Sequence, residues 1–280
     1  MHIIGICRFS LLGRGDWQAY RGKADEEIED IALEQAEILY APERMEARLA
    51  SFEHITLASI AAQTDKRFHF LVLASEFMPE QYRARLDAMC ARVPQVILRY
   101  FPMTTAGDAT MLMLEKMNIN LADTVQFRLD DDDGLFVNYV QRLRHFSNNL
   151  SQVTDAFSLS FSGVLFSVVG GEFAGSYHWP VAFFSAGAAM RHPRATIFGF
   201  GHFGLQHRMT SLTVPGRLSL ATHTGNNDTQ EIDFHTIRRR GMRLIEPAQL
   251  ETLVQRDFPY LTAEGRAIAG LPAQIAAAAE

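Results

Sequence analysis

Four consecutive aspartates, Asp130 to Asp133, are the residues of this chain best suited to chemistry. Adjacent carboxylates repel one another, and no folding argument favours placing such a run at the end of a buried strand. Asp133 alone is explained as an ordinary helix N-cap, but capping accounts for one aspartate and not for the run. A divalent cation, which prefers hard oxygen ligands, is the simplest partner for the rest. The sequence therefore predicts a functional acidic cluster here, rather than a solvated turn.

The elements before this cluster predict an α/β fold with a mostly parallel central sheet flanked by helices. Val125–Leu129 is apolar and β-favouring, and apolar residues at helical spacing follow the aspartates from Phe136 to Phe146. Upstream, strands are expected over 2–9, 68–74 and 96–101, alternating with helices over 42–62, 79–90 and around 106–121. Strand and helix alternation of this kind is typical of a parallel sheet, which binds ligands at the carboxyl ends of its strands. We therefore expect the aspartates to share that edge with Arg8, Ser75 and Glu76.

The second half of the chain is β-rich. Residues 157–169, 181–184 and 212–220 read as strands, and 246–258 as a helix. We find no convincing linker, so residues 1–150 and 151–280, the latter with a helical C-terminal tail, are expected to form one continuous domain.

Charge and composition limit the classes of function. The net charge is -6 and the sequence has no long basic run, which argues against nucleic-acid binding. Its 2 cysteines cannot build a disulfide framework. The first residues lack the pattern of a signal peptide, and no apolar run is long enough to span a membrane. We expect a cytoplasmic protein, with peripheral membrane contact left open.

The aspartate-ending strand and one upstream passage together resemble a GT-A glycosyltransferase. Leu57–Asp65 followed by Phe68–Leu73 is similar to the helix-to-strand passage of such enzymes, in which Gln63 and Thr64 fall at the family's Gln-Thr position. From Arg8 to His223 the chain resembles the bacterial rhamnosyltransferase family. An isolated Asp-x-Asp motif is a weak signal, and the same motif at the end of a fourth parallel strand, after this passage, is more specific.

The resemblance implies a GT-A fold with a donor-binding half over 1–150 and an acceptor side over 151–280. It implies a hexosyltransferase of polysaccharide biosynthesis that moves a sugar, with rhamnose suggested, from a nucleotide-diphosphate donor to a saccharide or glycolipid hydroxyl. Mn²⁺ or Mg²⁺ bound by carboxylates would stabilise the leaving diphosphate. The Asp-x-Asp motif maps onto Asp130 and Asp132, and strand alternation places these two on one face. Asp131 and Asp133 also satisfy the motif, so its register stays open.

The resemblance also assigns roles to individual residues. Asp132 and Asp133 are expected metal ligands, with His223 as a third ligand or, alternatively, a hydrogen-bonded loop histidine. The donor would be bound by residues at the strand ends and at the start of one helix. Three of these residues have an alternative role: Arg8 in a salt bridge at the rim, Asp108 as a helix N-cap and Arg128 in structural ion pairing. These donor-binding residues are Arg8, Ser75, Glu76, Asp108, Arg128, Asp130 and Asp131.

A general base near the acceptor is expected if the enzyme inverts configuration. His202, in a glycine-flanked loop, and Glu172 are the candidates, while His207 lies in a helical pattern and reads as structural. Two other functions remain open. A nucleotidyltransferase uses similar carboxylate–metal chemistry, but Ser10–Gly15 only faintly matches its glycine-rich loop. A non-catalytic cation- or sugar-binding protein is the other, although the Asp-x-Asp-x-Asp-Gly spacing of a calcium loop is missing.

Overall fold

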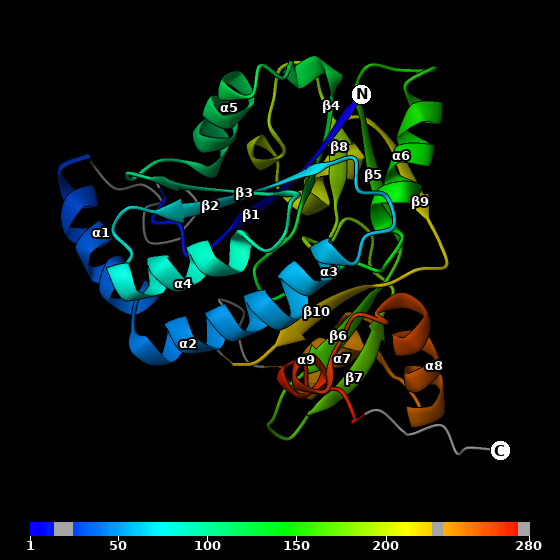
Figure 1. Ribbon diagram of the computed structural model, residues 1–280. Coiled ribbons are helices and arrows are strands. Elements are labelled where there is room, and N and C mark those ends of the chain that lie inside the picture. The colour runs from blue at the N-terminus through cyan, green and yellow to red at the C-terminus, as the bar shows by residue number, and fades with distance from the viewer. Residues whose placement is uncertain (14–24, 226–231, 274–280) are drawn as a thin grey trace.

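The computed structural model describes residues 1–13, 25–225 and 232–273 of the chain. Two sheets form its framework, and helices cover the larger one on both faces (Figure 1). The first half alternates strands and helices as the sequence predicts. Its elements are β1 (His2–Arg8), α1 (Asp25–Leu39), α2 (Pro42–Ser51), η2 (Phe52–Leu57), α3 (Ala58–Ala61), β2 (His69–Ser75), α4 (Glu80–Cys90), β3 (Val96–Phe101), α5 (Ala106–Lys116), η3 (Leu121–Asp123), β4 (Thr124–Arg128) and α6 (Tyr139–Leu150).

The second half contributes strands to both sheets. Its elements are β5 (Phe157–Phe161), β6 (Val164–Val168), β7 (Gly175–Trp179), β8 (Ala189–Arg191), η4 (Ile197–Gly199), η5 (His202–His207), β9 (Thr210–Val214), β10 (Ser219–His223), α7 (Phe234–Arg239), β11 (Arg243–Leu244), α8 (Pro247–Asp257) and α9 (Ala263–Ile268). No helix within the described ranges combines the length and the apolar character needed to cross a membrane.

The larger sheet has the strand order β3-β2-β1-β4-β8-β5-β9. Strands β1 to β4 are parallel to one another, β8 runs antiparallel to both β4 and β5, and β9 is parallel to β5. All strands except β8 therefore run in one direction. The expected α/β fold with a mostly parallel central sheet is confirmed, and the carboxyl ends of β1, β2, β3 and β4 share one edge.

The smaller sheet has the order β10-β6-β7-β11 and lies below the larger one in Figure 1, beside α7, α8 and α9. The expected strand over residues 157–169 is two strands, because Ser162 and Gly163 turn the chain and Gly163 has a φ of 100°. The expected strand over 181–184 is wrong. Phe183 has a φ of 57°, in the left-handed region that strands do not use, so the segment turns.

Apolar side chains fill both faces of the larger sheet. Helices α2, α4 and α6 pack on one face and α5 on the other, as Figure 1 shows. Beneath the aspartates, edge-on aromatic contacts join Phe127, Phe136, Tyr139 and Phe161 at centroid distances of 4.9–5.5 Å. Contacts of this geometry contribute roughly 0.5–1.5 kcal/mol each beyond the area they bury. This cluster gives the acidic segment a rigid base.

Candidate active site at the carboxyl edge

The four aspartates form a turn and do not extend the strand. Strand β4 ends at Arg128, and the amide of Asp133 donates to the carbonyl of Asp130 at 3.3 Å. The expectation that strand alternation places Asp130 and Asp132 on one face is therefore wrong, because alternation ends with the strand. We call residues 130–133 the acidic loop. Its side chains have different partners.

Asp130 lies between two arginines. Its Oδ1 is 3.8 Å from Nη2 of Arg8 and 4.0 Å from Nη2 of Arg128, and it also accepts a hydrogen bond from the Ser185 side chain. Burial raises the pKa of Asp130, but Arg128 and Arg8 outweigh that effect and leave this pKa below its ordinary value. Arg8 and Arg128, both predicted from sequence, thus meet Asp130 where β1 and β4 end. The pairing that we weighed as an alternative for each arginine is present.

Phe198 and His202 complete this group. The Phe198 ring lies under both guanidinium groups, 5.4 Å from Arg8 and 5.1 Å from Arg128. Burial, together with the positive charges of Arg128 and Arg8, lowers the pKa of His202 to about 4, although Asp130 opposes them. His202 is therefore neutral near pH 7. We call Arg8, Arg128, Asp130, Phe198 and His202 the arginine cluster.

The hydrogen bond of His202 indicates its tautomer. Nδ1 lies 2.9 Å from the carbonyl oxygen of Phe183, which can only accept, so Nδ1 carries the proton. The remaining ring nitrogen, Nε2, then keeps a lone pair. The left-handed backbone of Phe183 aims this carbonyl, and strained backbone of this kind is often found at functional sites.

Asp131 turns to the helix that begins at Pro42. Its Oδ1 accepts from Arg48, whose guanidinium forms an ion pair with it, and its buried Oδ2 has no hydrogen-bond partner among the described residues. Burial raises the pKa of Asp131; Arg48 opposes the rise, and Asp130 adds to it. One arginine therefore does not fully compensate this carboxylate.

A π-helical segment, η2, binds the backbone of the acidic loop. The Thr56 hydroxyl lies 2.9 Å from the Asp133 carbonyl oxygen and 3.4 Å from that of Asp130, and the Ser51 hydroxyl lies 3.4 Å from the Asp131 carbonyl oxygen. Such π segments interrupt α-helices frequently at functional sites, because the extra residue re-aims side chains. Here Thr56 of the segment and Ser51, the last residue of α2, direct their hydroxyls to the loop.

Asp132 and Asp133 lie against β10 of the smaller sheet. The Thr222 hydroxyl donates to the Asp132 carbonyl at 2.8 Å, and the Thr222 amide donates to the carboxylate of Asp133. Burial and the neighbouring carboxylates raise the pKa of Asp132 to about 7 and that of Asp133 well above its ordinary value. The carboxyl groups at this end of the loop therefore hold their protons more tightly than ordinary aspartates do.

His223 follows Thr222 but lies on the other face of the smaller sheet. Its ring stacks on that of Phe166, with 6.1 Å between the ring centroids. Burial lowers the pKa of His223, and the charge of Arg240 lowers it further. Its Nδ1 has no hydrogen-bond partner among the described residues. Because successive strand residues point to opposite faces, the ring does not face the aspartates as the Thr222 hydroxyl does. Its role as a metal ligand stays a prediction.

The other predicted site residues lie outside these contacts. Ser75 is buried at the end of β2, where its hydroxyl accepts from the Phe77 amide, and the neighbouring Glu76 is exposed. The Asp108 amide and carboxylate both bond to Thr105, so Thr105 is the N-cap of α5 and the alternative of an N-cap at Asp108 is wrong. Glu172 is exposed between β6 and β7. The donor-binding and catalytic roles given to these residues stay predictions.

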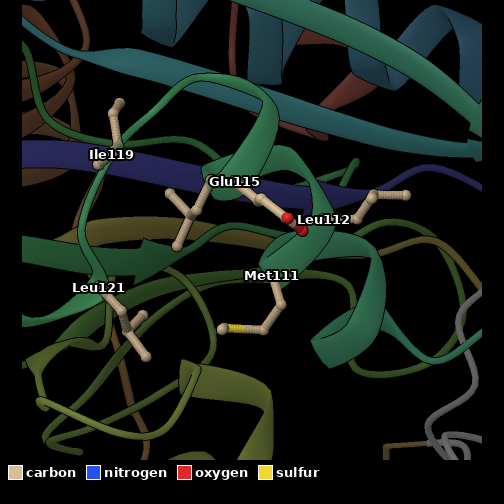
Figure 2. A pocket seen from close by; sticks show the side chains of 6 residues that line it. Met111, Leu112, Glu115, Ile119 and Leu121 are labelled. Carbon is tan, nitrogen blue, oxygen red and sulfur yellow. The ribbon is translucent and has the colours of Figure 1, made fainter.

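A pocket of about 340 Å³ lies at a different place, beside α5 (Figure 2). Its lining includes Met111, Leu112 and Leu121, with Glu115 as the charged member. Leu121 precedes β4, so this pocket opens near the amino end of that strand and not at the carboxyl edge. The residues that line this pocket include no cationic group for the diphosphate expected from the sequence, so we place the candidate site at the carboxyl edge.

Across residues 1–13, 25–225 and 232–273, no group of three or more His, Cys, Asp or Glu side chains is arranged to hold a metal ion. Magnesium-type ions in phosphate-transferring sites are commonly held by one or two carboxylates, with the remaining ligands supplied by substrate phosphates and water. Asp132 and Asp133, with their raised pKa values, fit such a two-carboxylate site. The chemistry of the acidic loop is therefore compatible with a cation that arrives with its substrate.

Several residues of this site were missed from the sequence. Arg48, Thr56, Ser185, Phe198 and Thr222 contact the acidic loop or its arginines from segments distant in sequence. Polar residues on the otherwise apolar face of the helix after Pro42 were the available signal for Thr56. The other four residues have no comparable signal in the sequence.

Comparison with protein families identifies the group to which this site belongs. Residues 2–236 match the family model described as "Putative rhamnosyl transferase". The chain belongs to this family. The expected resemblance is confirmed, and with it the expectation of a glycosyltransferase.

Solved structures of TarS from S. aureus are similar to this chain at low identity. A TarS structure covers 61% of this chain at 11% identity with a TM-score of 0.34, and the chain spans only 23% of that protein. TarS 1-349 in complex with UDP gives 10% identity, a TM-score of 0.42 and coverage of 91% of this chain and 70% of that one. TarS 1-349 in complex with UDP-GlcNAc gives 10% identity, a TM-score of 0.41 and coverage of 91% of this chain and 66% of that one. No curated protein sequence matches the chain.

Proposed function

We propose that this protein transfers a hexose, with rhamnose as the first candidate, from a nucleoside-diphosphate donor to a hydroxyl of a saccharide or glycolipid. The observation that carries the proposal is the meeting of Arg8 and Arg128 with the acidic loop at the carboxyl edge of the sheet. Cationic groups next to clustered carboxylates suit a substrate that brings both negative phosphates and a divalent cation.

Asp132 and Asp133 are the residues that would hold the cation. Burial, and then repulsion from neighbouring carboxylates, raise both of their pKa values, and a positive ion beside them would relieve that repulsion. Bound there, Mg²⁺ or Mn²⁺ supplies positive charge that stabilises the leaving diphosphate.

Arg8 and Arg128 are the proposed diphosphate contacts. Phe198 packs against both guanidinium groups from one side, and their N–H groups are of the kind that phosphate oxygens accept from. Asp130 links the two arginines and limits their movement. Since a bound diphosphate is more highly charged than one carboxylate, it competes well with Asp130 for both arginines.

His202 is the proposed general base. In a direct displacement the acceptor oxygen bonds to the anomeric carbon, the bond from that carbon to the diphosphate oxygen breaks, and the hydroxyl proton moves to Nε2 of His202. Burial, and then the charges of Arg128 and Arg8, lower the pKa of this histidine. A diphosphate bound between them offsets their charge and raises that pKa, so the base becomes stronger once the donor is bound.

A thermal-shift measurement tests the donor site. Uridine, thymidine and guanosine diphosphates are each added with and without Mn²⁺ to the native protein, to Asp132→Asn and to the control Asp123→Asn, which changes an exposed aspartate before β4. We expect one nucleotide to raise the Tm with Mn²⁺ in the native and control proteins but not in Asp132→Asn. A shift that is independent of Mn²⁺, or that survives in Asp132→Asn, contradicts the proposed cation site.

A further inference from the structure

A line of aromatic contacts leads away from the arginine cluster. It starts at His202, which contacts Phe203 at 4.0 Å and Phe184 at 5.9 Å between ring centroids. Phe184 then contacts Trp179 at 5.3 Å, and Trp179 carries the guanidinium of Arg240 over its face at 4.7 Å. These contacts thus connect His202, the proposed base, with Arg240, which follows α7 beside the smaller sheet.

The first part of this line is open to solvent. Phe203 is 43% exposed and Phe184 is only partly buried, whereas Trp179 is 8% exposed. Phe203 thus presents an exposed apolar ring next to His202 of the arginine cluster. Aromatic rings of this kind offer an apolar surface to the C–H face of a sugar, while the polar groups around them fix its orientation.

The line also runs beside the acidic loop. Phe184 is next to Ser185, whose side chain donates to Asp130. At the far end, Phe166 contacts Trp179 at 5.7 Å and His223 at 6.1 Å, and the neighbouring Thr222 bonds the Asp132 carbonyl. A molecule lying on the exposed rings would therefore lie next to the donor side of the site.

The end of the line is positively charged. Burial lowers the pKa of His223, and the positive charge of Arg240 lowers it further. Burial and the charge of Arg243 lower the pKa of His178 in the same way. Arg238 and Arg239 add charge to this region of a chain whose net charge is -6. Stacking on Trp179 uses the face of the Arg240 guanidinium and leaves its N–H edge for an anion. Neutral sugars make no use of this charge.

We propose that Phe184, Phe203 and Arg240 form an acceptor subsite for a saccharide that carries a negatively charged substituent, either a carboxylate or a phosphate. The sugar ring packs on Phe203 and Phe184, and its anionic group bonds to Arg240. This assignment rests on the proposed glycosyl transfer, since it places the acceptor hydroxyl near His202.

Trp179 provides a binding signal that is independent of turnover. The sequence contains 2 tryptophans, so Trp17→Phe leaves Trp179 as the single fluorescent indole. In that background we would titrate methyl β-glucuronide, glucose 6-phosphate and neutral methyl β-glucoside while recording fluorescence. The first two probes separate a carboxylate ligand from a phosphate ligand.

We expect at least one anionic probe to bind about tenfold more tightly than the neutral one, as one charge-assisted contact allows. Arg240→Gln should remove this preference, and Arg240→Lys should restore part of it. Phe203→Ala should weaken all probes by about threefold to tenfold. The controls are Arg99→Gln on β3 and Leu112→Ala on α5, whose 41% exposure matches that of Phe203. Both should bind as the parent does.

Equal affinity for neutral and charged probes, a preference that survives Arg240→Gln, or no fluorescence response overturns the subsite. The same variants are tested for the Mn²⁺-dependent nucleotide shift. Loss of that shift in every protein would count against the proposed donor site, whereas a normal shift without anion preference would count against the subsite alone.

Discussion

At the scale of single residues, the carboxyl of Asp132 links the charge of the acidic loop to the stability of the protein. Its pKa rises from 3.8 to about 7 on folding, chiefly because burial and Asp131 disfavour the ionised form. An acid with a raised folded pKa binds its proton more tightly in the native state. Its contribution to stability therefore falls as the pH rises from about 4 to about 7, and the penalty is complete above that range.

Asp132→Asn should remove this penalty. With a chelator present at pH 8, we expect a gain of about 1–2 kcal/mol, less than the full shift implies because Asp132 is partly exposed, or roughly 2–5 °C in Tm. The gain should shrink as the pH is lowered toward 4. Melting curves of the native protein, Asp132→Asn and Asp123→Asn across this range check the prediction. A gain that is the same at every pH would show that charge is not its source.

His202→Gln separates chemistry from binding. Glutamine retains a group that can donate to the Phe183 carbonyl, but it has no basic nitrogen in place of Nε2. We expect kcat to fall by about 10²–10⁴, the usual contribution of a general base, while the Kd for the nucleoside diphosphate changes little. His207→Gln, which alters an exposed histidine of the same segment, is the control. Activity close to that of the control would remove His202 as the base.

At the scale of elements, η2 contacts the acidic loop through the hydroxyl of Thr56. Thr56→Val removes the Thr56 hydroxyl, and with it the hydrogen bonds to the Asp133 and Asp130 carbonyls, while keeping the side-chain shape. We expect a loss of about 1–3 kcal/mol in unfolding free energy, because buried carbonyls lose their partner. The Mn²⁺-dependent nucleotide affinity should fall as well. Urea unfolding and nucleotide titration measure the two effects.

Thr252→Val is the matched control, because the Thr252 hydroxyl bonds only the carbonyl of Ala248 within its own exposed helix turn. A Thr56→Val protein that loses stability but binds nucleotide as tightly as this control would limit η2 to a structural role.

The elements also show what the sequence can predict. Strands β1 to β4 were found because each is a short apolar run whose pattern is local. The π-helical turn was missed because its apolar spacing also fits an ordinary α-helix. The false strand over 181–184 came from apolar residues that form a turn, in which Phe183 is buried and takes a left-handed conformation. Arg48 was missed because its contact with Asp131 spans 83 residues. Pairings of this range follow from the packing of elements, not from local pattern.

At the scale of the whole molecule, the C-terminal segment supports the acidic loop although the family match ends at residue 236. The carbonyl of Asp257 accepts from the Val137 amide at 2.8 Å, and the Tyr260 hydroxyl donates to the Leu135 carbonyl at 2.9 Å. Asp257 is itself buried and paired with Arg217 and Arg256. Residues after the matched region thus fix the backbone that follows the aspartates.

Gly134 is the point at which these supports meet. It pairs with Leu220 of β10, and a Cβ there would lie 2.7 Å from the Tyr260 hydroxyl and 3.3 Å from Ile55. Gly134→Ala therefore pushes on the larger sheet's acidic loop, the smaller sheet and the C-terminal segment together. We expect a loss of about 1–3 kcal/mol, as for overpacking of a filled core, together with a weaker nucleotide shift.

Gly204→Ala is the control, since a Cβ at Gly204 meets no atom within 4 Å. If the three parts act as one unit, chemical unfolding of Gly134→Ala should remain a single transition at lower denaturant concentration, by fluorescence and by circular dichroism alike. Two separated transitions would instead show that the smaller sheet unfolds alone. The proposed cation site, which lies between the two sheets, would then depend on a contact that opens before the rest of the molecule.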